Sequence, residues 1–401
     1  MNAHVYHVAA AALSLFFAVS AHAQTINIAG PNKLASLYAA LDDPANAGKA
    51  VRLGPGTYVL DKTQSNAGRL QLQPGMTLQG QDGDSAAVVI DASALTSYQA
   101  EGFMTGAIRM GLGTNTLKWL TVTGSSGAAN IETDLSSADY PDAVVRITNV
   151  VSKDATRGID VRNVGLAQAQ RSIEAYLADN VIKDNTNGEG VGLRIVNTNG
   201  ASEATINVTL VQNELIGNYA GLVADNLTVS TNTIPPSTIG SAVKIRSSGD
   251  RFVSNGTGVL IFGGISALGA ATNSNLVTFD GEDDTFTNNI RDLTNTQLAP
   301  FDRGGVVVYG AFNGSSLTDP VADPGNNNAA VVTLTRPQFD SNQNADVVTY
   351  GALSSNGKTR PGTNNHVLVV LQSASPGASI AAAVASQPRY TAGNDTAIVI
   401  H

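Results

Sequence analysis

The chain has 401 residues, a net charge of −9, 40 glycines and no cysteine. Its hydrophobic fraction of 42% excludes a disordered chain, and the charged fraction of 14% is low for a helical protein. Without cysteine, disulfides, thiol nucleophiles and cysteine-ligated metals are excluded. An acidic chain with no Lys/Arg cluster also argues against a nucleic-acid partner.

The first 23 residues have the pattern of a secretory signal peptide. Residues 8–19 form an apolar run that is too short to span a bilayer, and Ala21-His22-Ala23 fits the small-x-small cleavage rule. The segment departs from the usual pattern because it contains no Lys or Arg. We expect a mature chain that starts at Gln24, is secreted to the periplasm or beyond, and has no transmembrane segment. The alternative is a buried N-terminal helix.

A short helix and a series of short strands follow. Leu34, Leu37, Tyr38 and Leu41 fall at i, i+3, i+4 and i+7, which predicts an amphipathic helix over residues 32–41. Apolar residues that alternate between glycine- or proline-containing turns then predict strands. These expected strands lie near residues 51–53, 57–60, 70–72, 76–78 and 88–91.

From about residue 149 the sequence repeats itself. Each unit has an Asn or Asp, an apolar residue, a second Asn or Asp, and a Gly before an apolar-x-apolar strand. Such a unit, repeated every thirty-odd residues, predicts one turn of a solenoid per repeat, with turns about 4.8 Å apart. The apolar residue of the unit is expected at Val151, Ile182, Leu215, Phe252, Phe286 and Phe339.

The second polar residue of each unit predicts a column at one corner of the solenoid. Asparagines at the same corner of stacked turns can bond to each other and to the backbone of the bend. We interpret the column as scaffold and not as a functional site. Its members are Asp154, Asn185, Asn218, Asn255, Asn289 and Asn342.

The Gly54-Pro55-Gly56-Thr57-Tyr58 entry, the helix before it and the Asn-cornered turns resemble the pectate-lyase-like family of right-handed β-helix proteins. The resemblance covers most of residues 25–350, and its motifs specify architecture, not reaction. It implies an all-β fold, a right-handed parallel β-helix with a short N-terminal capping helix. The expected organisation is a signal peptide at 1–23 and a single domain at 24–401, with entry turns to 116, repeat turns at 117–350 and C-terminal strands at 351–401.

Histidine usage narrows the chemistry further. The expected mature chain keeps only His366 and His401, which excludes a Ser-His-Asp triad and a multi-histidine metal site. The Gly-His-Gly segment of the polygalacturonase-type members is absent. Lyases of the family use Arg or Lys as the base, often with Ca²⁺. The resemblance therefore implies binding or modification of a polysaccharide, with a lyase-type reaction on an anionic glycan as one form.

Alignment of the turns on a glycine yields one group of candidate glycan-binding residues. Counting four residues from Gly158, Gly190 and Gly221 brings two arginines and a carboxylate to one outward position. Two arginines flanked by carboxylates have the chemistry to bind an acidic sugar. The alternative is a surface ion-pair ladder that contributes little to stability. The candidate residues are Asp160, Arg162, Arg194 and Asp225.

A second basic pair is found in a predicted strand. Lys244 and Arg246 alternate with Val243 and Ile245, so both cations point outward from the same face. We consider them either a substrate-groove pair or an ordinary solvated strand face.

Two acidic clusters have ligand chemistry suited to Ca²⁺, Asp82-Gly83-Asp84 and Glu282-Asp283-Asp284. Neither has EF-hand spacing or the glycine-rich repeat of calcium-binding β-rolls, so solvated turns are the alternative. The sequence identifies no cofactor and no metal ligand set beyond these Ca²⁺ candidates.

Two functions remain open at this point. The first is a secreted β-helix protein that binds or modifies a polysaccharide or cell-surface glycan. The second is a non-catalytic surface, matrix or adhesion module, which the scarcity of histidine and the missing motifs favour. The sequence does not decide whether the protein is an enzyme.

Overall fold

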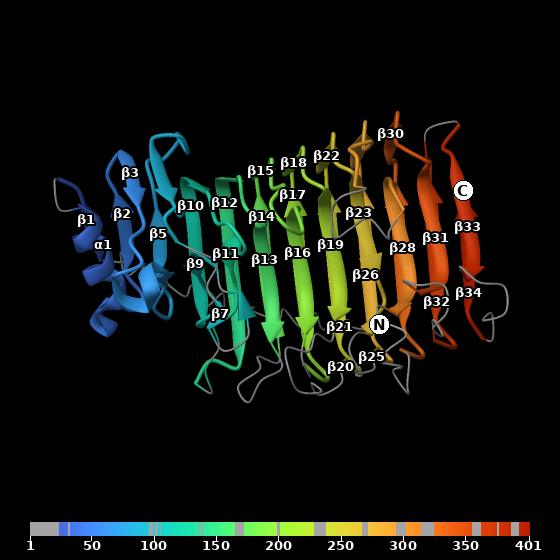
Figure 1. Ribbon diagram of the computed structural model, residues 1–401, viewed down its shortest axis with the longest axis horizontal. Helices are drawn as coiled ribbons and strands as arrows, with labels where there is room; N and C mark the ends of the chain where they lie inside the picture. The colour runs from blue at the N-terminus through green and yellow to red at the C-terminus, as the bar shows by residue number, and fades with distance from the viewer. Residues whose placement is uncertain are drawn as a thin grey trace, which may run out of the picture.

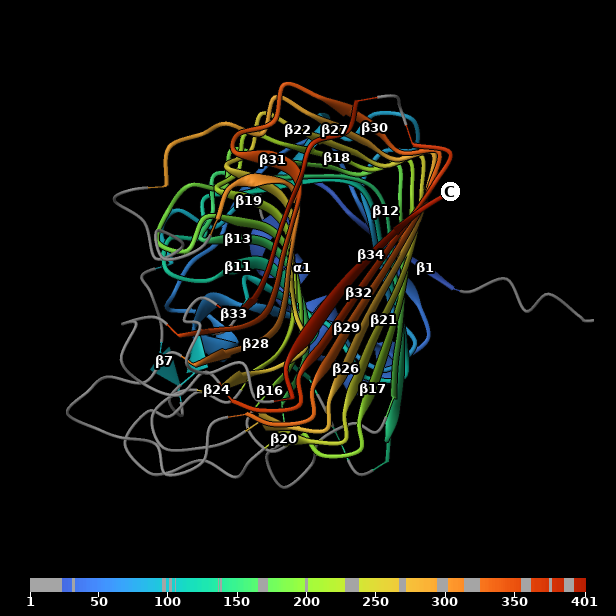
Figure 2. The same ribbon diagram turned by 90° about the vertical axis from the view of Figure 1, so that its right-hand side faces the viewer.

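The computed structural model describes residues 24–30, 33–95, 99–100, 103–104, 106–135, 137, 139–164, 172–198, 201–227, 238–266, 272–293, 302–313, 325–354, 362–374, 377–385 and 393–401. The expected signal peptide lies outside these residues. The described strands stack into an elongated right-handed parallel β-helix (Figure 1). Viewed along its axis, each turn crosses three sheets (Figure 2). The expected fold class is confirmed.

Sheet 1 carries the first strand of each turn. Its members pair in parallel, one turn above the next, from β1 to β34. They are β1 (Thr25–Ile28), β2 (Ala50–Leu53), β5 (Thr77–Gln79), the first parts of β10 (Thr114–Thr123) and β12 (Asp142–Lys153), β14 (Ser172–Ala178), β17 (Thr205–Val211), β21 (Ala242–Ser248), β26 (Leu276–Glu282), β29 (Ala329–Thr335), β32 (His366–Gln372) and β34 (Asp395–Ile400).

Sheet 2 carries short strands, and sheet 3 closes the turn. Sheet 2 contains β3 (Gly56–Val59), β6 (Val88–Asp91), the last residues of β10 and β12, β15 (Val181–Lys183), β18 (Glu214–Ile216), β22 (Arg251–Val253), β27 (Thr285–Thr287) and β30 (Gln338–Asp340). Sheet 3 contains β4 (Leu70–Gln71), β9 (Ile108–Arg109), β11 (Ala129–Glu132), β13 (Arg157–Val164), β16 (Val191–Thr198), β19 (Ala220–Leu227), β23 (Thr257–Phe262), β28 (Gly304–Asn313), β31 (Ala345–Ser354) and β33 (Ile380–Ala385).

Short accessory pairings lie beside these sheets. They are the antiparallel pair β7 (Gln99–Ala100) and β8 (Phe103–Met104), the parallel pair β20 (Thr238–Ile239) and β25 (Thr272–Asn273), and β24 (Ile265–Ser266) against β19 and β28. The chain turns from sheet 1 to sheet 2 through residues in the left-handed conformation, which Asp and Gly tolerate well. Asp179, Gly249 and Asp283 are examples, with φ of 55°, 66° and 57°.

The expected asparagine column follows these corners. Asn185 Nδ2 donates to Asn218 Oδ1 at 3.0 Å, and the pattern continues through Asn255 and Asn289 to Asn342. The expectation was wrong for Asp154, because the backbone N–H of Ala155 donates to Asn185 Oδ1 and so Ala155 holds that place. Two further ladders mark the other corners, and none of their members was singled out as a ladder from the sequence. They are Asn180–Asn213–Asp250–Asp284 and Ser241–Asn275–Asn328–Asn365–Asn394.

The apolar file also follows the repeat. Ile182, Leu215, Phe252, Phe286 and Phe339 pair in direct register on sheet 2. The Phe252 and Phe286 rings stack with their centroids 5.1 Å apart, which extends the dispersion contacts of the core. For Val151 the expectation was off by one residue, because Ser152 pairs with Ile182 and occupies the inward position.

The helix α1 (Lys33–Asp42) forms where the apolar spacing predicted it. Leu37, Tyr38 and Leu41 are buried, and Tyr38 Oη donates to the carbonyl oxygen of Gly68 at 2.7 Å. The helix lies at the N-terminal end of the stack in Figure 1, where it covers the first turns of a core that continues through the solenoid. No helix among the described residues is long and apolar enough to cross a membrane.

Candidate functional site

The outward face of sheet 3 is buried, unlike that of an ordinary solvated sheet. Every residue of β16, β23 and β28 is buried, so these strands lack the alternation of a sheet with one wet face. In the later turns the outward residues form a second apolar cluster, where Phe262 stacks on Tyr309 and Tyr309 on Tyr350. In the earlier turns the outward residues are charged.

The register of sheet 3 depends on a file of glycines at the start of its strands. A Cβ on Gly158 would lie 2.6 Å from the carbonyl oxygen of Gly192, and one on Gly192 would lie 2.6 Å from that of Gly221. A side chain does not fit at such distances, so glycine is needed where one turn packs on the next. Gly192 therefore holds the place that the sequence alignment gave to Gly190.

This correction changes which candidate residues are neighbours. Arg194 pairs with Asp160, not with Arg162, and Arg162 is in register with Val196 and then Asp225. The count from Gly190 was two residues short. The structure nevertheless brings all four of these candidates into one cluster on sheet 3.

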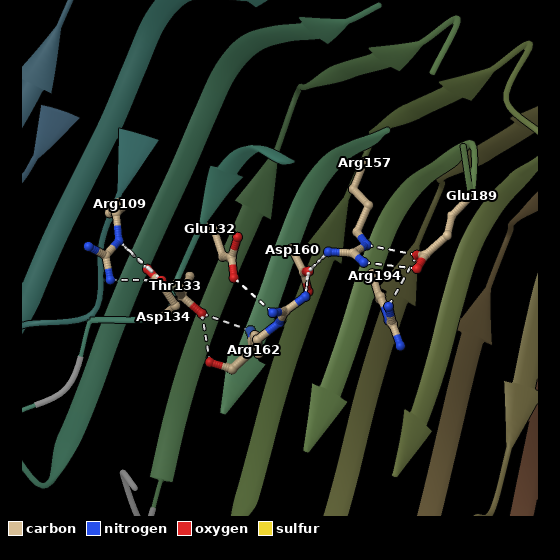
Figure 3. A network of polar contacts seen from close by, with 9 residues as sticks. All are labelled: Arg109, Glu132, Thr133, Asp134, Arg157, Asp160, Arg162, Glu189 and Arg194. Atoms are coloured by element: carbon tan, nitrogen blue, oxygen red, sulfur yellow. Dashed lines mark hydrogen bonds and ion pairs between the residues drawn. The ribbon is translucent and has the colours of Figure 1, made fainter. Parts of the chain in front are cut away.

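The cluster is a chain of alternating charges that runs along the solenoid axis (Figure 3). Arg162 contacts Glu132 at 3.1 Å and Asp160 at 2.6 Å, and Arg157 bridges Asp160 at 3.1 Å to Glu189 at 2.8 Å. Arg194 then bridges Glu189 at 3.1 Å to Asp225 at 3.5 Å. We call this the charge chain: Glu132–Arg162–Asp160–Arg157–Glu189–Arg194–Asp225.

Burial distinguishes the charge chain from a surface ladder. Glu132 and Asp160 are 0% exposed, and Arg157 and Arg162 are 5% and 6% exposed. The alternative of a surface ion-pair ladder is therefore wrong, because these ion pairs are buried and do not lie on the surface. Charges removed from water at this depth require close partners, and removal of one partner costs several kcal/mol.

The pKa of each carboxyl depends on its position in the charge chain. Burial raises the pKa of Glu132 to about 8, against the opposing effect of Arg162, its single arginine contact. Burial likewise raises the pKa of Asp225 to about 6 against Arg194. Glu189 contacts two arginines, and although its burial acts in the opposite direction, they hold the pKa of this carboxyl well below its usual range.

Several members of the cluster were not found from the sequence. Arg157 and Glu189 each come directly before an aligned glycine, Gly158 and Gly190, but the count followed only the residues after each glycine. Glu132 lies before the aligned turns. Arg109 and Asp134 form a bidentate pair beside the chain, with contacts from 2.9 Å. Recognising them required the register between β9, β11 and β13.

Lys244 and Arg246 lie elsewhere, on the outward face of sheet 1. The burial pattern of β21 alternates as predicted, with Val243 and Ile245 buried and both cations exposed. Neither cation forms an ion pair with another described residue. Lys244 therefore does not share a groove with Arg162 and Arg194, which are buried on sheet 3.

The strand register places Arg246 in a row across sheet 1. Pairing from β12 to β29 aligns Arg146, Tyr176, Thr209, Arg246 and Asp280, and then Thr333. Arg146 is exposed and Tyr176 is 40% exposed. Neither residue was predicted as a site from the sequence, although the alternation of Val145-Arg146-Ile147 and Ala175-Tyr176-Leu177 indicates that both point outward.

A hollow of about 290 Å³ opens beside this row. Its wall includes Thr209, Arg246, Ser248, Asp280, Glu282 and Thr333. Side chains that donate and accept hydrogen bonds therefore surround it, as in sites that bind hydroxyl-rich molecules.

The two candidate Ca²⁺ clusters do not gather their carboxylates. Glu282 and Asp283 contact Arg336 at 2.6 and 2.7 Å, whereas Asp284 is buried at the corner of the solenoid. Asp82 contacts Arg52 at 3.6 Å, and Asp84 caps the backbone N–H groups of the turn after it. No group of three or more His, Asp or Glu suited to a metal occurs within the described part of the chain.

No family model matches the sequence, and no curated protein matches it. Solved structures match at the level of the chain path. The A-module of mannuronan C-5 epimerase AlgE6 from Azotobacter vinelandii matches with 15% identity and a TM-score of 0.35, covering 92% of this chain and 96% of that one. Escherichia coli YbhC matches with 12% identity and a TM-score of 0.38, covering 71% and 76%.

The Agl-KA catalytic domain matches with 13% identity and a TM-score of 0.41, covering 95% of this chain and 69% of that one. Such likenesses concern fold alone. The strands of this chain, which pair in parallel from one turn to the next, themselves form a right-handed parallel β-helix.

Proposed function

We propose that the protein binds an acidic polysaccharide along the outward face of sheet 1. The observation that carries this proposal is the row with Arg146 and Arg246, which are exposed and unpaired within the described residues, on either side of the exposed Tyr176. Lys244 lies two residues from Arg246 on the same face. These are the residues that we expect to contact the glycan.

The chemistry of the row fits a chain of acidic sugars. Arg146 and Arg246 are three strands apart, a distance of about 14 Å at the spacing of a β-sheet. Each guanidinium group can bind a carboxylate through two parallel hydrogen bonds. The ring of Tyr176 offers an apolar surface for the C–H face of a sugar, and the hydroxyl end stays wet.

The negative net charge of the protein means that an acidic glycan can bind only where cations are gathered locally. A chain of net charge −9 repels polyanions in general, so binding an acidic glycan requires local cations. We therefore expect carboxylate-bearing polysaccharides to bind better than neutral ones, and binding to weaken as salt rises.

The experiment measures binding of the full chain to polyuronates and to a neutral glucan by calorimetry at low salt. Arg246→Ala and Arg146→Ala are each expected to weaken polyuronate binding about 3- to 10-fold, as loss of an exposed ionic contact does. The matched control is Arg251→Ala, an exposed cation on sheet 2, which should bind like the parent protein. Equal binding by the parent and the Arg146/Arg246 double variant would contradict the proposal.

Binding without catalysis is the form that we propose, because Arg162 and Arg194 on sheet 3 do not converge with Lys244 and Arg246 on sheet 1. This agrees with the surface, matrix or adhesion alternative and extends it with a ligand. Unsaturated uronate absorbance, followed with and without Ca²⁺, should stay flat in the presence of polyuronates. A rise that Arg246→Ala abolishes would instead make sheet 1 the site of a lyase.

We further propose export of the chain, on the sequence pattern of residues 1–23. Sequencing the N-terminus of protein recovered from the periplasm or medium should give Gln24 as the first residue. An intact Met1 in that fraction would contradict cleavage.

A further inference from the structure

The charge chain ends in a carboxylate at both ends. It contains four carboxyl groups, from Glu132, Asp160, Glu189 and Asp225, and three guanidinium groups. Arginine stays protonated in proteins. With every carboxyl ionised the chain would therefore hold one uncompensated negative charge at a depth where little water reaches it.

We propose that the charge chain retains one proton at neutral pH, that this proton is on Glu132, and that its loss at alkaline pH loosens the early turns of sheet 3. The inference concerns a conformational device and is independent of glycan binding on sheet 1.

The surroundings of Glu132 favour the retention of the proton at this end of the charge chain. On the neighbouring strand β9, Arg109 is in register with Glu132. The guanidinium group of Arg109, however, forms its ion pair with Asp134, which follows β11. From β13, Arg162 and Arg157 favour the ionised form, and Asp160 disfavours it. Neither carboxyl oxygen of Glu132 accepts a hydrogen bond from a described residue, so nothing else stabilises the anion.

Asp225, at the other end of the charge chain, binds a proton less tightly. Burial raises the pKa of Asp225 only to about 6, so this carboxyl is ionised at pH 7. The pKa of Glu132 is raised from 4.5 to about 8. A single proton therefore stays on Glu132 across the neutral range, and the chain as a whole is then electrically balanced.

The sign of the pH effect follows from this difference. In the unfolded chain Glu132 ionises near its ordinary pKa, and in the folded protein it ionises only near 8. The unfolded state therefore binds fewer protons within this window, and stability falls as pH rises through it. One proton changes the ratio of folded to unfolded protein about tenfold per pH unit.

The first experiment compares urea unfolding of the parent protein and Glu132→Gln from about pH 5 to pH 9. The variant keeps the shape and neutral charge of the protonated acid, so its curve should be less steep than the parent curve by the contribution of one proton, about tenfold per pH unit. The contribution of Asp284 remains in both curves. Glu174→Gln, an exposed carboxyl on sheet 1, is the control and should retain the parent slope. Parallel curves for parent and Glu132→Gln would overturn the proposal.

A second measurement does not depend on how stable the variant is. The chain contains seven glutamates, so ¹³C labelling of their side-chain carboxyls gives a small set of resonances. One of them, that of Glu132, should titrate near pH 8 in the parent protein and be missing from the spectrum of Glu132→Gln. Titration of all seven below about pH 6 would likewise overturn the proposal.

Discussion

The outward faces of sheet 1 and sheet 3 carry the same kinds of side chain in different surroundings. On sheet 1, Arg246 is exposed and unpaired among the described residues, and the strand alternates between buried and exposed positions. On sheet 3, Arg162 is 6% exposed and contacts two carboxylates. An outward arginine on one sheet is thus available to a ligand, and on the other it is part of the structure.

Strand alternation indicates only which side chains point away from the solenoid core. Arg162 and Arg246 both alternate with apolar residues in sequence. Their different roles arise because the outward face of sheet 3 is buried and that of sheet 1 is solvated. Substitutions of matched arginines on the two sheets therefore test this difference.

The largest effect is expected for Arg162→Ala. The substitution leaves Glu132 and Asp160 without their shared cation, and breaking a buried ion pair typically costs about 3 to 5 kcal/mol. Arg246→Ala should change the free energy of unfolding by less than about 0.5 kcal/mol, because it is exposed. Urea unfolding of both variants at neutral pH measures this difference, and similar losses for the two would remove the contrast between the sheets.

An intermediate effect is expected at a buried carboxyl that has no arginine. Asp284 takes the place of an asparagine in the Asn180 ladder, and burial, followed by repulsion from Asp250, raises its pKa to about 8. Stability is therefore lost as pH rises toward 8. Asp284→Asn should remove this charge and its repulsion from Asp250, and raise the free energy of unfolding by about 1 to 2 kcal/mol above that pH.

The control for Asp284→Asn is its behaviour in acid. Below about pH 5 the carboxyl is protonated in the folded protein, so the stabilisation should largely vanish. A gain that is independent of pH would mean that Asp284 is not the titrating group.

The smallest effect concerns salt. Exposed charges are screened at about 1 M salt, where the Debye length is about 3 Å, but buried pairs are screened much less. Polyuronate binding on sheet 1 should therefore be lost at this salt concentration. The stability loss caused by Arg162→Ala should change by less than about 0.5 kcal/mol between low and high salt. A loss that salt removes would mean that the charge chain is solvated.

Much of the architecture follows from the sequence alone. The recurrence of Ile182, Leu215, Phe252, Phe286 and Phe339 predicted a stacked file, and the structure pairs these residues in register. The spacing of Leu37, Tyr38 and Leu41 predicted the capping helix. These features are local because one repeat builds one turn, so the periodicity of the sequence is also the periodicity of the structure.

The arrangement of the charge chain was decided by tertiary packing. Gly192, and not Gly190, is the glycine that the close approach of neighbouring turns requires, and no single repeat shows this. With Gly192 in this place, Arg194 lies beside Asp160. Sequence alternation directs Arg162 and Arg246 outward, but it does not specify what lies beyond the sheet. Burial of one face and solvation of the other arise only in the assembled solenoid, where they make one arginine structural and leave the other accessible.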